Sequence, residues 1–98
     1  LDYGTRHEII HVIDLLYKNN VKLGMPYVEK INKPGLRALR IKHGSNIYRI
    51  LFFAFTGQKF ILLHIIKKKS DKLPKPVIQL AIKRMEDYKS RFMNLNAS

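Results

Sequence analysis

The fold of this chain is decided by residues 35–66, which read GLRALRIKHGSNIYRILFFAFTGQKFILLHII. Leu36 to His43 alternates, with Leu39 and Ile41 on one side and polar residues on the other, which is typical of a half-buried strand. Two further runs of strand length, rich in aromatic and β-branched residues, span Ile47–Thr56 and Lys59–Ile66. The turns between the runs are predicted at Gly44-Ser45-Asn46 and Gly57-Gln58. The stretch therefore predicts three consecutive antiparallel strands.

Helices are predicted before and after these strands. Thr5 and Glu8 have the spacing of a capping box, which predicts a helix from Thr5 to about Asn20 with one apolar face. Prolines near residue 75 favour the start of a second helix, from about Pro74 to Phe92. Between the first helix and the strands, residues 21–34 contain a glycine and two prolines, so we expect no sheet strand and no long helix there.

The predicted fold class is α+β, in which a small antiparallel sheet, a three-strand meander, packs against an N-terminal and a C-terminal helix. A chain of 98 residues has material for one core of moderate size, so residues 1–98 are expected to form a single domain. No apolar run approaches the length of a membrane span, and we expect no membrane partner.

The chain is strongly basic, with 19 Lys and Arg against 7 Asp and Glu and a formal charge of +12. Nearly all of the surplus follows Leu36. Such concentrated positive charge attracts anions, among which nucleic-acid phosphates are the commonest for a small basic domain. The chain has no cysteine, which excludes disulfides, thiolate zinc sites and cysteine nucleophiles and favours a cytoplasmic location.

One motif suggests zinc. His7, Glu8 and His11 have the H-E-x-x-H spacing of zinc proteases. The context is poor, because six residues precede the motif and a third ligand would have to come from elsewhere. We interpret the two histidines as ordinary surface residues and expect neither a metal nor a cofactor.

A cationic cluster is the stronger candidate for a site. Arg37, Arg40 and Lys42 belong to the first predicted strand and Arg49 to the second, and neighbouring strands bring residues of one sheet face together. The basic loop Lys67–Lys72 could complete the cluster at the end of the third strand. Guanidinium and ammonium groups suit phosphate binding. The alternative, a cationic outer face without a site, stays open.

The residue types restrict the chemistry. The sequence offers no acidic pair for a two-metal site and no serine with evident His and Asp partners. RNA cleavage remains, because the attacking group can be the 2′-hydroxyl of the substrate, and Arg, Lys and His can move its proton and stabilise the phosphate. His64 on the third strand is a candidate base, with a structural core histidine as the alternative.

These residues resemble a known family of toxins, the HigB-type, phage-protein-like branch of the RelE/ParE superfamily. The resemblance is carried by Gly35–Gly44, Asn46–Phe53, Leu62–His64 and Lys68–Pro74, followed by a basic helix. It implies the toxin of a type II toxin–antitoxin system, a metal-independent endoribonuclease that cleaves mRNA on the ribosome. It also implies neutralisation by a cognate HigA-type antitoxin with a helix-turn-helix domain.

The resemblance also implies roles for single residues. Arg49 corresponds to the strand arginine that holds the scissile phosphate, and Arg40 and Lys42 become candidates for base or charge stabiliser. The expected catalytic residues are Arg49, Lys68, Arg40, Lys42 and His64, and the expected RNA-binding residues are Arg37, Lys69, Lys72 and Lys67.

Two departures and three alternatives accompany this interpretation. Family members usually begin with a β-strand and part of a helix before the segment matching Thr5. This chain lacks that strand and helix, so we expect a short or open sheet edge. Ser70 and Leu73 replace residues of the last motif, without removing a cation. The alternatives are a ParE-like gyrase inhibitor, a degenerate toxin that only binds antitoxin, and a basic RNA-binding module without cleavage.

Overall fold

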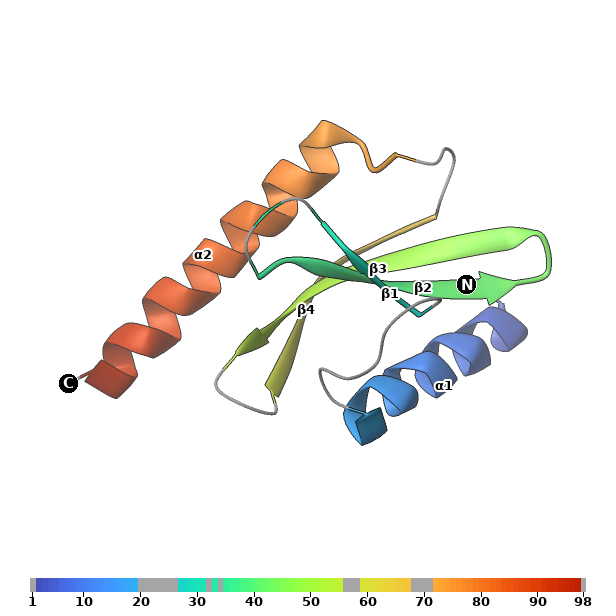
Figure 1. The fold of residues 1–98 in the computed structure, drawn as a ribbon, viewed down its shortest axis with the longest axis horizontal. Helices are drawn as coiled ribbons and strands as arrows, with labels where there is room; N and C mark the ends of the chain where they lie inside the picture. Colours follow the sequence, from blue (N-terminus) through green and yellow to red (C-terminus); the bar gives the residue numbers. More distant parts are fainter. Residues whose placement is uncertain are drawn as a thin grey trace.

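An antiparallel sheet lies between two helices (Figure 1). The computed structural model describes residues 2–19, 27–31, 33, 35–55, 59–67 and 72–97, with side chains as far as Phe92. Along the chain the elements are α1 (Tyr3–Asn19), β1 (Val28–Lys30), β2 (Arg37–His43), β3 (Asn46–Phe55), β4 (Lys59–Lys67) and α2 (Lys75–Ala97). The predicted α+β class, with a helix on either side of a strand meander in the sequence, is confirmed.

The sheet has the order β1-β2-β3-β4, and each neighbouring pair is antiparallel. A tight turn at Gly44-Ser45 joins β2 to β3, with His43 opposite Asn46. Gly44 has a φ of 62°, a left-handed conformation that favours glycine. The second predicted turn, at Gly57-Gln58, lies outside the described residues.

The short strand β1 corrects the expectation of no strand in residues 21–34. Val28 pairs with Leu39 and Lys30 with Arg37. Backbone hydrogen bonds extend the contact, since the N–H of Arg40 donates to the carbonyl of Tyr27 at 2.7 Å. Three residues are too few to display an alternating pattern, so the sequence of β1 alone does not predict a strand. Pairing with β2 holds it in the sheet.

Both helices begin close to where the sequence places them. Helix α1 starts at Tyr3, two residues earlier than expected, because Asp2 is the cap: its Oδ1 accepts the N–H of Thr5 at 2.7 Å. The Thr5 side chain is buried inside the first turn, so the predicted capping box is wrong. The pKa of Asp2 is lowered because its carboxylate accepts this backbone hydrogen bond. At α2, the Pro74 carbonyl accepts the N–H groups of Val77 and Ile78.

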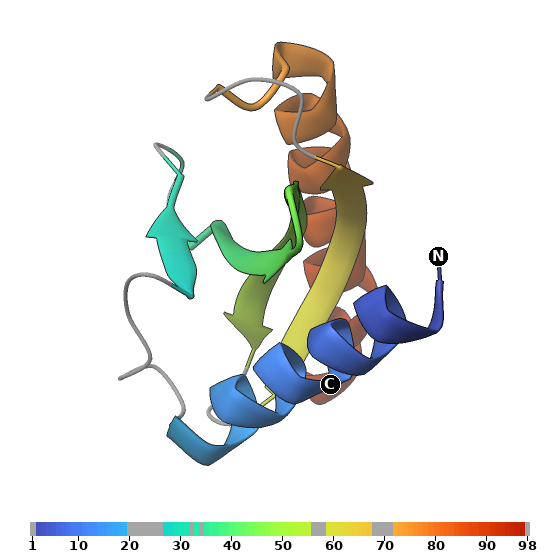
Figure 2. The same ribbon diagram turned by 90° about the vertical axis from the view of Figure 1, so that its right-hand side faces the viewer.

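Helices α1 and α2 lie on opposite sides of the sheet (Figure 2). Each helix covers its own apolar core. On one face, Val12 and Leu16 of α1 pack in a cluster with strand residues Leu39, Ile41, Ile50 and Phe52. On the other, Ala81 and Met85 of α2 pack in a cluster with Leu51, Phe53, Phe55 and Leu63. Alternate residues of β3 therefore serve opposite cores, which explains why this strand is an almost continuous apolar run.

A β-bulge adapts β4 to the helix above it. The pairing shifts between Leu51, which faces His64, and Phe52, which faces Leu62, so Leu63 is the extra residue. Its side chain is buried in the core under α2, and its carbonyl accepts a hydrogen bond of 2.7 Å from Arg84 Nη1. The bulge thus fixes the helix to the edge strand.

The packing of α2 on the sheet can be tested at Ala81, whose side chain is fully buried. Ala81→Leu should lower the free energy of unfolding by about 1–3 kcal/mol, because a larger side chain does not fit between helix and sheet. Lys83→Leu, at an exposed position of the same helix, should change it by less than about 0.5 kcal/mol. Urea denaturation measures both; equal effects would contradict the packing described here.

Candidate functional site

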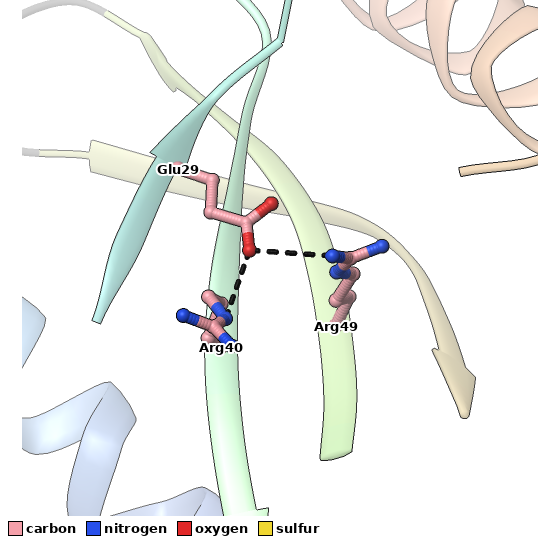
Figure 3. Close-up of polar contacts among 3 residues, drawn as sticks. All are labelled: Glu29, Arg40 and Arg49. Atoms are coloured by element: carbon pink, nitrogen blue, oxygen red, sulfur yellow. Dashed lines mark hydrogen bonds and ion pairs between the residues drawn. The ribbon is translucent and has the colours of Figure 1, made fainter. Parts of the chain in front are cut away.

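Two arginines lie directly opposite each other in the sheet. Arg40 of β2 pairs with Arg49 of β3, and both side chains are on the face that carries Ala38 and Leu51. Glu29 of β1 points between them (Figure 3). Its Oε1 is 2.8 Å from Arg40 Nε and 3.4 Å from Arg49 Nη2. One carboxylate oxygen therefore makes ion pairs with two guanidinium groups on neighbouring strands.

The three side chains differ in exposure. Those of Arg40 and Glu29 are 27% and 23% exposed, whereas that of Arg49 is 5% exposed. Like charges directly opposite each other destabilise a sheet, and a buried guanidinium requires a counter-charge. The carboxylate of Glu29 reduces the repulsion between the two arginines and is a counter-charge for the buried Arg49. The register of β1 and the positions of the arginines therefore depend on each other.

Glu29 was not predicted as a site residue from the sequence. The signal was nevertheless present, because Glu29 is the sole acidic residue between Asp14 and Asp71 in a region rich in cations. Its role was hidden because β1 was not predicted, and without a strand there was no way to place its side chain on a sheet face.

Beside this pair, a cavity of about 190 Å³ opens between β2 and α1. Lys42 is exposed and lies on the same sheet face as Arg40, two residues further along the strand. The residues that line the cavity are Glu8, Val12, Tyr27, Arg40, Lys42 and Ile47. The cavity therefore combines two cations, a carboxylate and an aromatic ring.

Other predicted cations lie elsewhere. Arg37 pairs with Phe52 and Lys67 with Tyr48, so both follow the face toward α1, away from Arg49. The expectation of one cluster is wrong for these two residues, because the side chains of a strand alternate. Lys68 and Lys69 lie outside the described residues. Lys72 is exposed in the segment that leads into α2.

His64 lies on the face toward α2, half-buried, with its Nδ1 3.2 Å from Arg84 Nη1. A guanidinium has no acceptor, so Arg84 donates and Nδ1 accepts, which places the hydrogen of the neutral ring on Nε2. Within this contact His64 has no lone pair left to take a proton. His64 must leave Arg84 before it can act as a base.

The motif of His7, Glu8 and His11 lies on α1. Both histidines are exposed, and the ring of His7 stacks on that of Tyr3 at 6.4 Å between centroids. Over the part of the chain that the structure describes, no three His, Cys, Asp or Glu side chains gather in a group that could hold a metal ion. Glu8 instead lines the cavity beside Lys42.

Fold and site together define a small, strongly basic α+β domain with paired arginines on one sheet face. The sequence model of the family described as Phage derived protein Gp49-like (DUF891) matches residues 1–86. The chain belongs to this phage-derived family, which is toxin-like and consistent with the toxin of a toxin–antitoxin pair. No curated protein matches the chain. Neither α1 nor the described part of α2 is apolar enough over a sufficient length to cross a membrane.

The ion pairs of Glu29 can be tested by an isosteric substitution. Glu29→Gln should lower the free energy of unfolding by about 2–4 kcal/mol, because the guanidinium groups of Arg40 and Arg49 both lose their ion pair with this carboxylate. Asp14→Asn is the matched control, since the Asp14–Lys18 ion pair is exposed and its loss should cost under about 1 kcal/mol. Equal losses in urea denaturation would show that Glu29 has no special role.

Proposed function

We propose that this protein is the toxin of a type II toxin–antitoxin system, of the HigB-type branch of the RelE/ParE superfamily, and that it cleaves mRNA on the ribosome in the cytoplasm. The observation that carries the proposal is the pair Arg40 and Arg49, opposite each other on one sheet face, with Lys42 beside them at the cavity. Membership of a toxin-like family supports it.

The proposed reaction needs no group beyond the RNA and the protein. The 2′-oxygen of a nucleotide forms a bond to the adjacent phosphorus while the bond from phosphorus to the 5′-oxygen breaks. The 2′-hydroxyl gives its proton to a base, and the leaving 5′-oxygen takes one up. The products are a 2′,3′-cyclic phosphate and a 5′-hydroxyl. Catalysis then consists of positioning, proton transfer and stabilisation of charge on the phosphate.

The residues divide this work according to their exposure. Arg40 and Lys42 are accessible and stabilise the phosphate. Arg49, at 5% exposure, contributes its charge from behind Glu29 and touches the phosphate when that carboxylate moves aside. Among the described residues His64 is the candidate base, and Lys42 is the alternative base if it acts in its neutral form instead of as a charge stabiliser. Lys68 keeps its proposed catalytic role, and Lys69 and Lys72 their proposed RNA contacts, in the segment after β4.

The proposed partners follow from charge and from the resemblance. A chain of net charge +12 attracts ribosomal and messenger RNA through their phosphates. It also attracts acidic protein segments. The antitoxin we propose is a HigA-type protein with a helix-turn-helix domain, which neutralises the toxin as a hetero-oligomer.

The proposal is tested by inducible expression and by cleavage in a translating extract. Wild type should arrest growth and cut mRNA, with cyclic phosphate ends detected by mass spectrometry. Lys42→Ala and Arg49→Lys should each lower the cleavage rate by about 100-fold, as expected when one charge-stabilising group is lost or misplaced. Lys83→Ala, at another exposed cation on α2, should cleave as fast as wild type.

Circular dichroism separates loss of activity from loss of fold in these variants, and Lys42→Ala, at an exposed position, is expected to fold.

Intact mRNA during wild-type growth arrest would overturn the nuclease proposal, and damage dependent on DNA gyrase would favour a ParE-like inhibitor. The burial of Arg49 specifically favours a second candidate, a degenerate toxin that binds antitoxin without cleavage. Antitoxin binding without growth arrest would support that candidate.

A further inference from the structure

The cavity beside Arg40 exists because β1 is short. Pairing between β1 and β2 begins at Val28 and Leu39, and the remainder of β2 toward its C-terminal end has no strand on its outer side in the described part of the sheet. Helix α1 passes close to this uncovered edge, where the position of a Cβ on Gly4 would lie 2.8 Å from His43 Nε2. Side chains from α1 and from the strand edge therefore face a common space of about 190 Å³.

Tyr27 stands at this space with its position fixed by the backbone. Its carbonyl accepts the N–H of Arg40 at 2.7 Å, which ties the residue to the strand that carries the cations. The residue is 37% exposed and lines the cavity. Tyr27 is thus partly exposed at the cavity and belongs to neither core.

The charges around the ring favour an anionic ligand. Arg40, Lys42 and the carboxylate of Glu8 line the cavity. With the adjoining ion pairs of Glu29 and Arg49 included, three cations face two carboxylates, so one positive charge is in surplus. Aromatic rings beside cations form the usual platform for single-stranded nucleic acid, since the bases stack on the rings while the cations hold the backbone.

We infer that Tyr27 is the stacking platform of a nucleotide subsite, which takes one unpaired base of single-stranded RNA while Arg40 and Lys42 hold the adjoining phosphate. The identity of the ligand as RNA rests on the proposed function. The base must be unpaired, because a side-chain ring stacks on a base that has left the helical stack. Tyr27 is a positioning residue, which sets the strand relative to the cations.

The test uses a short 2′-O-methyl RNA with 2-aminopurine at its centre, which cannot be cleaved because it has no 2′-hydroxyl. Binding to the full chain is followed by fluorescence anisotropy and stacking by quenching of 2-aminopurine. Tyr27→Leu should weaken binding by about 5- to 150-fold and abolish the quenching. Tyr27→Phe should bind and quench as wild type does, since the ring is retained.

Tyr3→Leu is the matched control, because Tyr3 is an exposed tyrosine that does not line the cavity. It should bind and quench as wild type does. The salt dependence of binding should be the same for Tyr27→Leu and wild type, because the phosphate contacts remain. Thermal melting confirms that each variant is folded.

Equal binding and quenching by Tyr27→Leu and wild type would overturn the inference, as would a loss of antitoxin binding with unchanged RNA binding, which would make the cavity a protein interface. The two proposals fail separately. Quenching that depends on Tyr27 without cleavage in the translating extract supports the subsite and overturns the nuclease. Cleavage without quenching overturns the subsite alone.

Discussion

The contact of Glu29 with Arg49 is the interaction on which the site depends. Arg49 is a charged residue in a strand whose other buried side chains pack in the two apolar cores, and its own side chain is 5% exposed. Removing a guanidinium from water is costly unless a counter-charge lies close by. Because Glu29 meets Arg49 at 3.4 Å and Arg40 at 2.8 Å, one carboxylate offsets both the burial of one arginine and the repulsion between the two.

This contact also explains how a three-residue strand stays in place. Strand β1 has Val28 in the core under α1 and Glu29 on the opposite face. Apolar packing therefore holds one face of the strand, and ion pairs hold the other. The backbone bond between Arg40 and Tyr27 follows from the same register. The cavity edge at Tyr27 is therefore positioned indirectly by the ion pairs, and a change at Glu29 affects both the arginines and the aromatic ring.

The sequence was sufficient to predict an element where an apolar pattern repeats along the chain. The alternation from Leu36 to His43 predicted β2 with Leu39 and Ile41 facing a core, and the apolar runs predicted β3 and β4. The sequence was insufficient where a structural feature depends on one or a few residues. Strand β1 is too short to show an alternating pattern, and Asp2 and Thr5 are both suitable caps within a few residues of each other. The position of Arg37 was predictable from the sequence. Arg37 and Arg40 are three residues apart in one strand, so their side chains lie on opposite faces, and their shared charge does not bring them together.

The charges that make up the net charge of +12 act differently when they are exposed and when they are buried. Several acidic residues have local partners: Asp14 pairs with Lys18, Asp87 with Arg91, and Glu29 with Arg40 and Arg49. Exposed lysines such as Lys42 act on a polyanion through water and are screened by salt. Arg49 is shielded from solvent, so its ion pair with Glu29 is screened far less and persists at high ionic strength. Weakening of RNA binding by salt therefore reports the exposed cations, while the buried arginine sets the local geometry that those cations use.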